Sequence, residues 1–222
     1  MPPLLFMDIQ FVLYYIGLAS SSVCLIPFII GLINFNKISK QLMSLFWLLI
    51  INIIVEIINI MFANSGQSNQ YIFHYFTMAE FTLISLFYVF FFEDYFSSWL
   101  IKFLIPVFLI GAYIDSKVNG LNTVNNFSAS VESVILIFYS MFFFYYVLKN
   151  LIFENLLSTP VFWINTAVLF YFSGNLILFV FSNHMERIDP IKYGILWSVI
   201  HTFFNVLYNV FLSIGFWKTR VR

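Results

Sequence analysis

The sequence predicts an all-α, polytopic membrane protein folded as a seven-transmembrane-helix bundle, and two observations support this fold class. First, 62% of the 222 residues are hydrophobic and only 9% are charged, whereas a soluble domain carries about 25% charged residues. Second, apolar runs of roughly 18 or more residues, long enough to cross a bilayer, recur along the whole chain. A single transmembrane domain therefore accounts for residues 1–222.

Polar links separate the apolar runs and set the bounds of the predicted helices. The strongest turn signal is Asn119-Gly120, in the link before the fifth helix. Pro27 is expected to kink the first helix, and Pro106 lies inside the fourth. The predicted helices are residues 10–33, 42–62, 71–92, 99–113, 127–148, 160–182 and 192–216.

The distribution of basic residues predicts how the bundle is oriented. Seven spans put the termini on opposite sides of the membrane, and the cytoplasmic side is expected to carry more Lys and Arg. With the N-terminus outside, the inner segments hold Lys37, Lys40, Lys102, Lys149, Lys218, Arg220 and Arg222, and the outer segments hold only Lys117, Arg187 and Lys192. The count favours an N-out, C-in topology. The N-terminus has no basic region, so no cleaved signal peptide is expected.

Other features of composition exclude some functions. The formal net charge is zero, so no basic face is available for nucleic acid. The single cysteine, Cys24, excludes an internal disulfide and a thiolate metal cage. Most tryptophans lie near span ends, as in an aromatic belt at the membrane interfaces: Trp47, Trp99, Trp163, Trp197 and Trp217.

The ionisable side chains inside the spans all fall in the outer half of the predicted bundle. Glu56 lies about six residues, or roughly 9 Å, from the outer end of its helix, and Glu80 lies about nine residues from the outer end of the next. A carboxylate at a helix centre costs roughly 2.5–3.5 kcal/mol, so such residues are expected to face protein or water. The sequence predicts an outward-facing polar pocket lined by Glu56, Glu80, Glu132, Asn175, His201 and Asn205.

This set of residues suits binding of a cation, sensing of protons or binding of a metal. Three carboxylates cannot all stay charged when they are close together in a medium of low dielectric constant, so at least one is expected to be neutral. Structural interpretations are also open: His74 is near the interface and could be solvated, Glu132 could reach headgroups, and His201 with Asn205 could join helices by hydrogen bonds.

The leading hypothesis is a receptor-like or sensor module that binds a small ligand or a proton without a cofactor. Its signal would pass to a cytoplasmic partner on the basic inner face. An alternative is a metal-dependent intramembrane lipid hydrolase, in which His74, Glu80 and His201 would bind zinc and Glu56 or Glu132 would assist. A third is a small transporter or a subunit of a larger complex. Whether the chain is an enzyme stays open.

Several motifs resemble those of a known group of membrane proteins. They are Glu56, the segment 71–80 ending in Ala79-Glu80-Phe81, Phe162-Trp163-Ile164 after Pro160, Gly174, and the stretch from Trp197 through Asn205 to Tyr208. The chain is similar in these to small, uncharacterised seven-transmembrane proteins of Bacteroidota. The resemblance implies a multi-pass protein of the bacterial inner membrane and brings no established activity. A retinal-binding rhodopsin is rejected, because Lys192 lies at the edge of the last helix rather than at its centre.

Overall fold

A computed structural model describes residues 12, 15–65, 69–93, 95, 98–121 and 123–221. Within these residues the chain forms helices and no strand, and seven helical segments are long and apolar enough to cross a membrane. The spans are Tyr15–Ile33, Lys40–Phe62, Gln70–Phe92, Trp99–Val118, Asn126–Lys149, Pro160–Ile188 and Pro190–Lys218. The predicted all-α bundle of seven membrane-spanning helices is confirmed, although most of residues 10–14, the predicted start of the first helix, lie outside the described residues.

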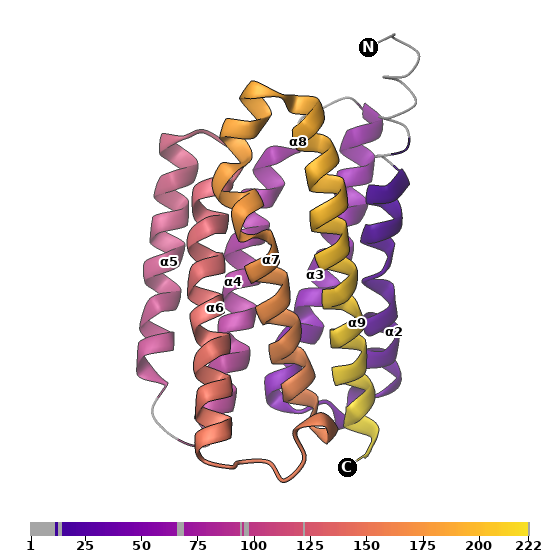
Figure 1. Ribbon diagram of the computed structural model, residues 1–222, viewed down its shortest axis with the longest axis vertical. Helices are drawn as coiled ribbons and strands as arrows, with labels where there is room; N and C mark the ends of the chain where they lie inside the picture. Colours follow the sequence, from indigo (N-terminus) through magenta and orange to yellow (C-terminus); the bar gives the residue numbers. More distant parts are fainter. Residues whose placement is uncertain are drawn as a thin grey trace.

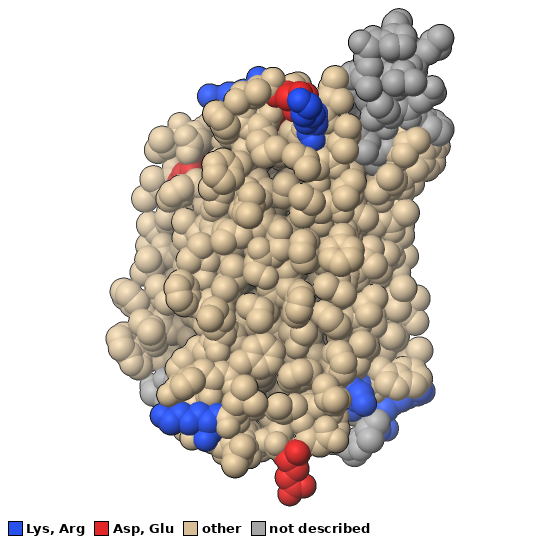
Figure 2. Space-filling model, in the orientation of Figure 1, with Lys and Arg blue, Asp and Glu red and all other residues tan. Residues whose placement is uncertain are grey.

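The surface of the bundle has the charge distribution of a multi-pass membrane protein. Lys, Arg, Asp and Glu gather at the two ends, and the broad middle of the face in Figure 2 carries none. Large apolar side chains are exposed along the spans, for example Phe138 in the span Asn126–Lys149, which is 66% exposed. Below, the half of the bundle that contains α8 is called the upper half, and the half that contains the C-terminus is called the lower half (Figure 1).

The helices pack around α4 (Gln70–Phe92) and α7 (Pro160–Ile188). On one side, α4 contacts α3 (Lys40–Ser65), α5 (Trp99–Val118) and α6 (Asn126–Lys149). On the other, α7 packs along α6 and α9 (Thr202–Lys218), and α9 packs on α2 (Leu25–Ile33). The core is mostly aromatic and leucine-rich, and it includes the fully buried Phe81, Phe92, Phe143 and Phe216.

Two predicted helices end five or six residues earlier than the helices of the structure. The fourth helix was predicted to end at residue 113, but α5 continues to Val118. It does so because the buried Asp115 accepts hydrogen bonds from Ser128 Oγ and Asn119 Nδ2, both at 2.6 Å. The sixth was predicted to end at residue 182, but α7 continues to Ile188 and includes most of the charged link.

The last predicted helix, residues 192–216, lies within one continuous span, Pro190–Lys218, which starts two residues earlier than predicted and contains a π-helical turn. It begins with α8 (Pro190–Leu196), passes through a π-helical turn at Trp197–His201, and continues as α9. Asp189 caps α8 by accepting a hydrogen bond from the Lys192 backbone N–H at 3.0 Å. That bond, together with the Lys192 ammonium, holds the pKa of Asp189 below its usual range.

The predicted effect of Pro27 and the predicted turn at Gly120 are both found. Pro27 has no N–H to offer the Val23 carbonyl, which instead accepts from the Ile26 N–H at 3.1 Å. The first span is accordingly interrupted at Val23 and Cys24. Gly120 has φ +85°, a left-handed conformation that favours glycine, at the end of α5.

Candidate functional site

The upper half of the bundle contains a cavity of about 640 Å³. Residues of the first span, α3, α4, α6, α7, α8 and α9 line it, and it extends from helix-end residues such as Asn69, Asn126 and Glu186 inward to Phe172 and Tyr208. This volume lies within the range of small-molecule sites, roughly 300–1,000 Å³. The sequence predicted a pocket in this half; it did not predict that the first span, through Ser20 and Ser21, forms part of the wall.

Three carboxyl groups from three helices face this cavity: Glu56 on α3, Glu80 on α4 and Glu132 on α6. Glu80 and Glu132 are close enough for their charges to interact, and the Tyr171 hydroxyl is close enough to interact with the charges of all three glutamates. Glu132 is only 2% exposed, and its Oε1 has no hydrogen-bond partner among the described residues. Because an unpartnered buried polar atom is costly, Glu132 is the least satisfied member of the group.

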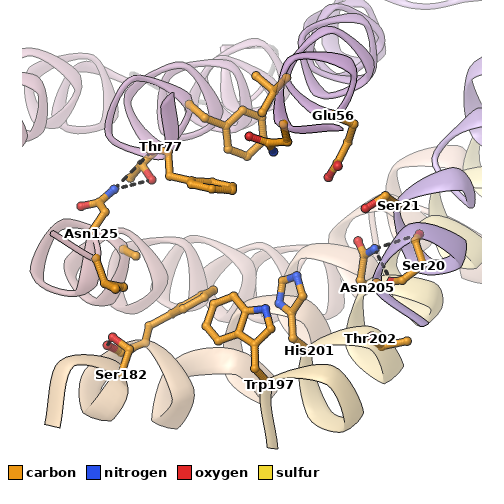
Figure 3. Close-up of a pocket in the computed structure, with 18 of the residues that line it drawn as sticks. Ser20, Ser21, Glu56, Thr77, Asn125, Ser182, Trp197, His201, Thr202 and Asn205 are labelled. Carbon is orange, nitrogen blue, oxygen red and sulfur yellow. Dashed lines mark hydrogen bonds between the residues drawn. The ribbon is translucent and has the colours of Figure 1, made fainter. Parts of the chain in front are cut away.

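His201 projects from the opposite wall, across the cavity from Glu56 (Figure 3). Its Nδ1 lies 3.3 Å from Asn175 Oδ1. Asn175 itself is fully buried, donates from Nδ2 to the Tyr171 carbonyl at 2.8 Å, and is not part of the cavity wall. Asn175 was predicted to line the pocket; instead it holds His201 from behind.

The π-helical turn determines which side chains α8 and α9 present to the cavity. It carries Trp197 and His201, whose rings stack with centroids 4.8 Å apart and planes at 21°. Phe179 and Tyr193 pack against the Trp197 ring at 5.9 and 5.8 Å. Trp197 was interpreted as part of an interfacial belt, but it lines the cavity. Single π-helical turns occur frequently at functional sites.

Asn205, also predicted to line the pocket, joins two helices at its wall. Its Nδ2 donates to the Ser20 hydroxyl at 2.9 Å and to the Ser20 carbonyl at 3.2 Å, which ties α9 to the first span (Figure 3). Asn209, one turn further along, donates to the Asn205 carbonyl at 2.8 Å. The structural interpretation of Asn205 as a helix-joining residue is therefore confirmed, and the residue also faces the cavity.

His74 lies away from the cavity. It is 2% exposed, and its Nε2 is 3.1 Å from the carbonyl of Thr123 in the link between α5 and α6. Asn125, in the same link, donates to Thr77 Oγ1 at 2.8 Å (Figure 3). These contacts fasten the link to α4 at the edge of the cavity. The interpretation in which His74 is solvated does not hold, because the residue is buried, and His74 does not join Glu80 and His201 on the cavity wall.

The lower half also contains a buried polar group that the sequence did not single out. Asn165 Oδ1 accepts from the Tyr88 hydroxyl at 2.8 Å, and Ser140 and Asn165 exchange hydrogen bonds with each other's carbonyls at 3.1 and 3.3 Å. These bonds join α4, α6 and α7 at a point where the sequence suggested mostly apolar packing. The atoms satisfy one another, so the group is a structural contact rather than a second site.

The arrangement of ligating side chains bears on the zinc alternative. Within the part of the chain that the structure describes, no group of three or more His, Cys, Asp or Glu is placed so that it could hold a metal ion. Of the three ligands proposed from the sequence, Glu80 and His201 face the cavity and His74 does not. Comparison of the chain with known protein families, with curated proteins and with solved structures gave no match.

Proposed function

We propose that the chain is a receptor-like or sensor module that binds a small ligand in the cavity of the upper half. The observation that carries this proposal is the convergence of Glu56, Glu80 and Glu132, from three helices, on one cavity of about 640 Å³. Carboxyl groups inside membrane spans are expensive and usually mark functional sites. The unpartnered Glu132 Oε1 supports the same conclusion.

The upper half faces outward in this proposal, and the protein resides in a bacterial inner membrane. Among the described residues, six Lys and Arg lie at the lower end and three at the upper end, and this excess supports the orientation through the positive-inside rule. The proposed ligand therefore enters from outside the cytoplasm, and a cytoplasmic partner receives the signal at the basic lower end.

The path from the cavity to the lower end runs through α9. The ligand would contact Trp197 and His201 in the π-helical turn at the start of this helix. Further along, Gly174 on α7 allows a close approach to α9, because a Cβ atom at this position would lie 2.4 Å from the Phe204 ring. A shift of the π-helical turn would thus slide α9 along α7 and so displace the C-terminal end of α9.

Accessibility of introduced cysteines tests the proposal. In a Cys24→Ser background, Thr202→Cys places a thiol on the cavity wall, Ser140→Cys places one in the fully buried lower core, and Lys149→Cys places one at the exposed lower end. A membrane-impermeant maleimide added to intact cells is expected to label Thr202→Cys, to leave Ser140→Cys unlabelled, and to label Lys149→Cys only after permeabilisation.

The labelling pattern separates the parts of the proposal. If Thr202→Cys reacts only after permeabilisation, the orientation is reversed. If it reacts under neither condition, no open cavity exists and the receptor proposal fails. As a second test, a thermal-shift screen of small molecules across pH should find ligands whose binding Glu80→Gln weakens without unfolding the bundle. Binding that Glu80→Gln leaves unchanged at every pH would contradict the assigned role of Glu80.

A further inference from the structure

Carboxyl groups are the only acidic or basic side chains of the cavity wall apart from one histidine, among the described residues. Besides Glu56, Glu80 and Glu132, the wall includes the exposed Glu186 near the opening and His201. No Lys or Arg is among the described residues that line the cavity. An anionic ligand would therefore find no countercharge there, whereas a cation would be drawn to several carboxyl groups.

The contact of His201 Nδ1 with Asn175 makes the other ring nitrogen, Nε2, a hydrogen-bond acceptor. Asn175 Nδ2 already donates to the Tyr171 carbonyl, so the Asn175 atom that faces His201 Nδ1 is its carbonyl oxygen, which can only accept. Nδ1 must therefore carry the hydrogen. In the neutral imidazole this leaves Nε2, on the other side of the ring, with a lone pair and no hydrogen.

The other unpartnered atoms of the wall are acceptors too. Asn125 uses Nδ2 to donate to Thr77, and its Oδ1 has no partner among the described residues. The same holds for Glu132 Oε1, on a side chain that is almost completely buried. The Tyr208 hydroxyl, which can accept or donate, is also unpartnered. Among the buried atoms of the wall that have no partner, acceptors therefore predominate, and a ligand with several N–H groups would supply donors to them.

Aromatic rings form the wall opposite Glu56. The stacked Trp197 and His201 rings, with Phe179 and Tyr193 packed against Trp197 and Tyr171 edge-on to His201 at 5.9 Å, make a broad apolar face. The faces of Trp and Tyr rings attract cations, and they also bury apolar surface. A bare metal ion would use neither this face nor most of the volume.

We propose that the cavity binds a small organic cation, a primary amine or guanidinium carried on an apolar or aromatic body. The charged head lies between Glu80 and Glu132 and donates to Glu132 Oε1, and the body packs against Trp197 and the His201 ring. This inference rests on the proposed function, since it names the class of ligand that the same cavity takes. It adds that neutral and anionic molecules of the same shape do not bind.

Four probes of one shape test the assignment: phenethylamine, its N,N,N-trimethyl derivative, 2-phenylethanol and 3-phenylpropionate. The readout is the rate at which the maleimide labels Thr202→Cys in the Cys24→Ser background, with purified protein in detergent. Saturating phenethylamine is expected to slow labelling about tenfold or more. The alcohol and the carboxylate should leave the rate nearly unchanged, and the trimethyl derivative, which has the charge but no N–H donor, should slow it less than the amine.

Carboxyl variants locate the charged head. Glu80→Gln and Glu132→Gln should each weaken phenethylamine binding by about tenfold or more, because each removes one partner of the ammonium. Glu93→Gln is the matched control: it also neutralises a glutamate, but at the lower end beyond α4, outside the cavity. It should bind the amine as the parent does.

The outcomes distinguish this inference from the receptor proposal. If Thr202→Cys is labelled but the alcohol or carboxylate protects it as well as the amine, or if no probe protects it, the cation assignment is overturned while an open cavity remains. Protection that survives in both Glu80→Gln and Glu132→Gln also overturns it. If Thr202→Cys is not labelled at all, the proposed function and this inference fail together.

Discussion

The upper and lower halves of the bundle are formed largely by the same helices but pack their side chains differently. In the lower half, α4 and α6 bury ring against ring, as in the Phe91–Phe143 pair with centroids 4.6 Å apart, and the polar atoms of Asn165 and Ser140 pair with each other. In the upper half, the same two helices carry Glu80 and Glu132 on the wall of a cavity. Buried hydroxyl groups without a partner occur in the lower half as well, at Ser85, Ser98 and Tyr139. The upper half differs in that it places an unpartnered carboxyl group, that of Glu132, on the wall of a cavity.

Truncation of one buried ring in each half should show the largest difference. Phe143 is 0% exposed, so Phe143→Ala should lower the free energy of unfolding by about 3–5 kcal/mol through lost contacts and a new cavity. Phe76→Ala, on the half-buried wall of the existing cavity, should cost clearly less, because little new void is created. Unfolding in mixed detergent micelles measures both. Equal losses would show that the upper half is packed as tightly as the lower.

Removal of the unpartnered carboxyl group of Glu132 should raise the free energy of unfolding, which is the opposite of the effect expected for the ring truncations. Glu132→Met keeps a side chain of similar length and eliminates a buried oxygen that has no partner among the described residues. In protein free of added ligand, the free energy of unfolding should rise by about 1–3 kcal/mol, the cost of one unsatisfied buried polar group.

The matched control for Glu132→Met is Asn165→Leu in the lower half. Asn165 is also fully buried, but its polar atoms bond to Tyr88 and Ser140, so its replacement should destabilise the bundle. The two substitutions are compared by the same unfolding measurement. Destabilisation by Glu132→Met would mean that this carboxyl group serves the fold, and the distinction between the two halves would then be lost.

The sequence was informative about depth in the membrane and much less so about direction around each helix. Counting residues from the span ends placed Glu56, Glu80, Glu132 and His201 in one half, and the structure brings all four to one cavity. Depth does not determine which neighbour a side chain contacts. Asn175 therefore lies behind His201 rather than on the cavity wall, and His74 contacts the Thr123 carbonyl.

A local sequence signal could have predicted where the last helix starts, but not the direction in which Trp197 points. Asp189 followed by Pro190 is a cap residue followed by proline at the first helical position, and this pair could have set the helix start two residues earlier than predicted. The π-helical turn that then rotates Trp197 and His201 into the cavity leaves no comparable mark in the sequence. Its place depends on how α8 and α9 pack on α7.

The smallest effect is expected at a paired carboxylate on the lower end, where Glu93 Oε1 lies 2.6 Å from Lys102 Nζ. The hydrogen bond from Lys102 lowers the pKa of this exposed carboxyl group below its ordinary value of 4.5. A lowered folded-state pKa stabilises the fold above the unfolded pKa, and this contribution is lost as pH falls through the folded-state value. Glu93→Gln should therefore lower the unfolding midpoint slightly at pH 7, since exposed ion pairs contribute little. The difference from the parent should shrink as pH falls below about 4.5 and disappear below the lowered folded-state pKa, where the folded parent loses the same charge. A difference that persists in acid would mean that Glu93 acts by packing and not by charge. Its disappearance would set this solvent-exposed, paired glutamate apart from Glu132 of the cavity, whose Oε1 has no partner among the described residues.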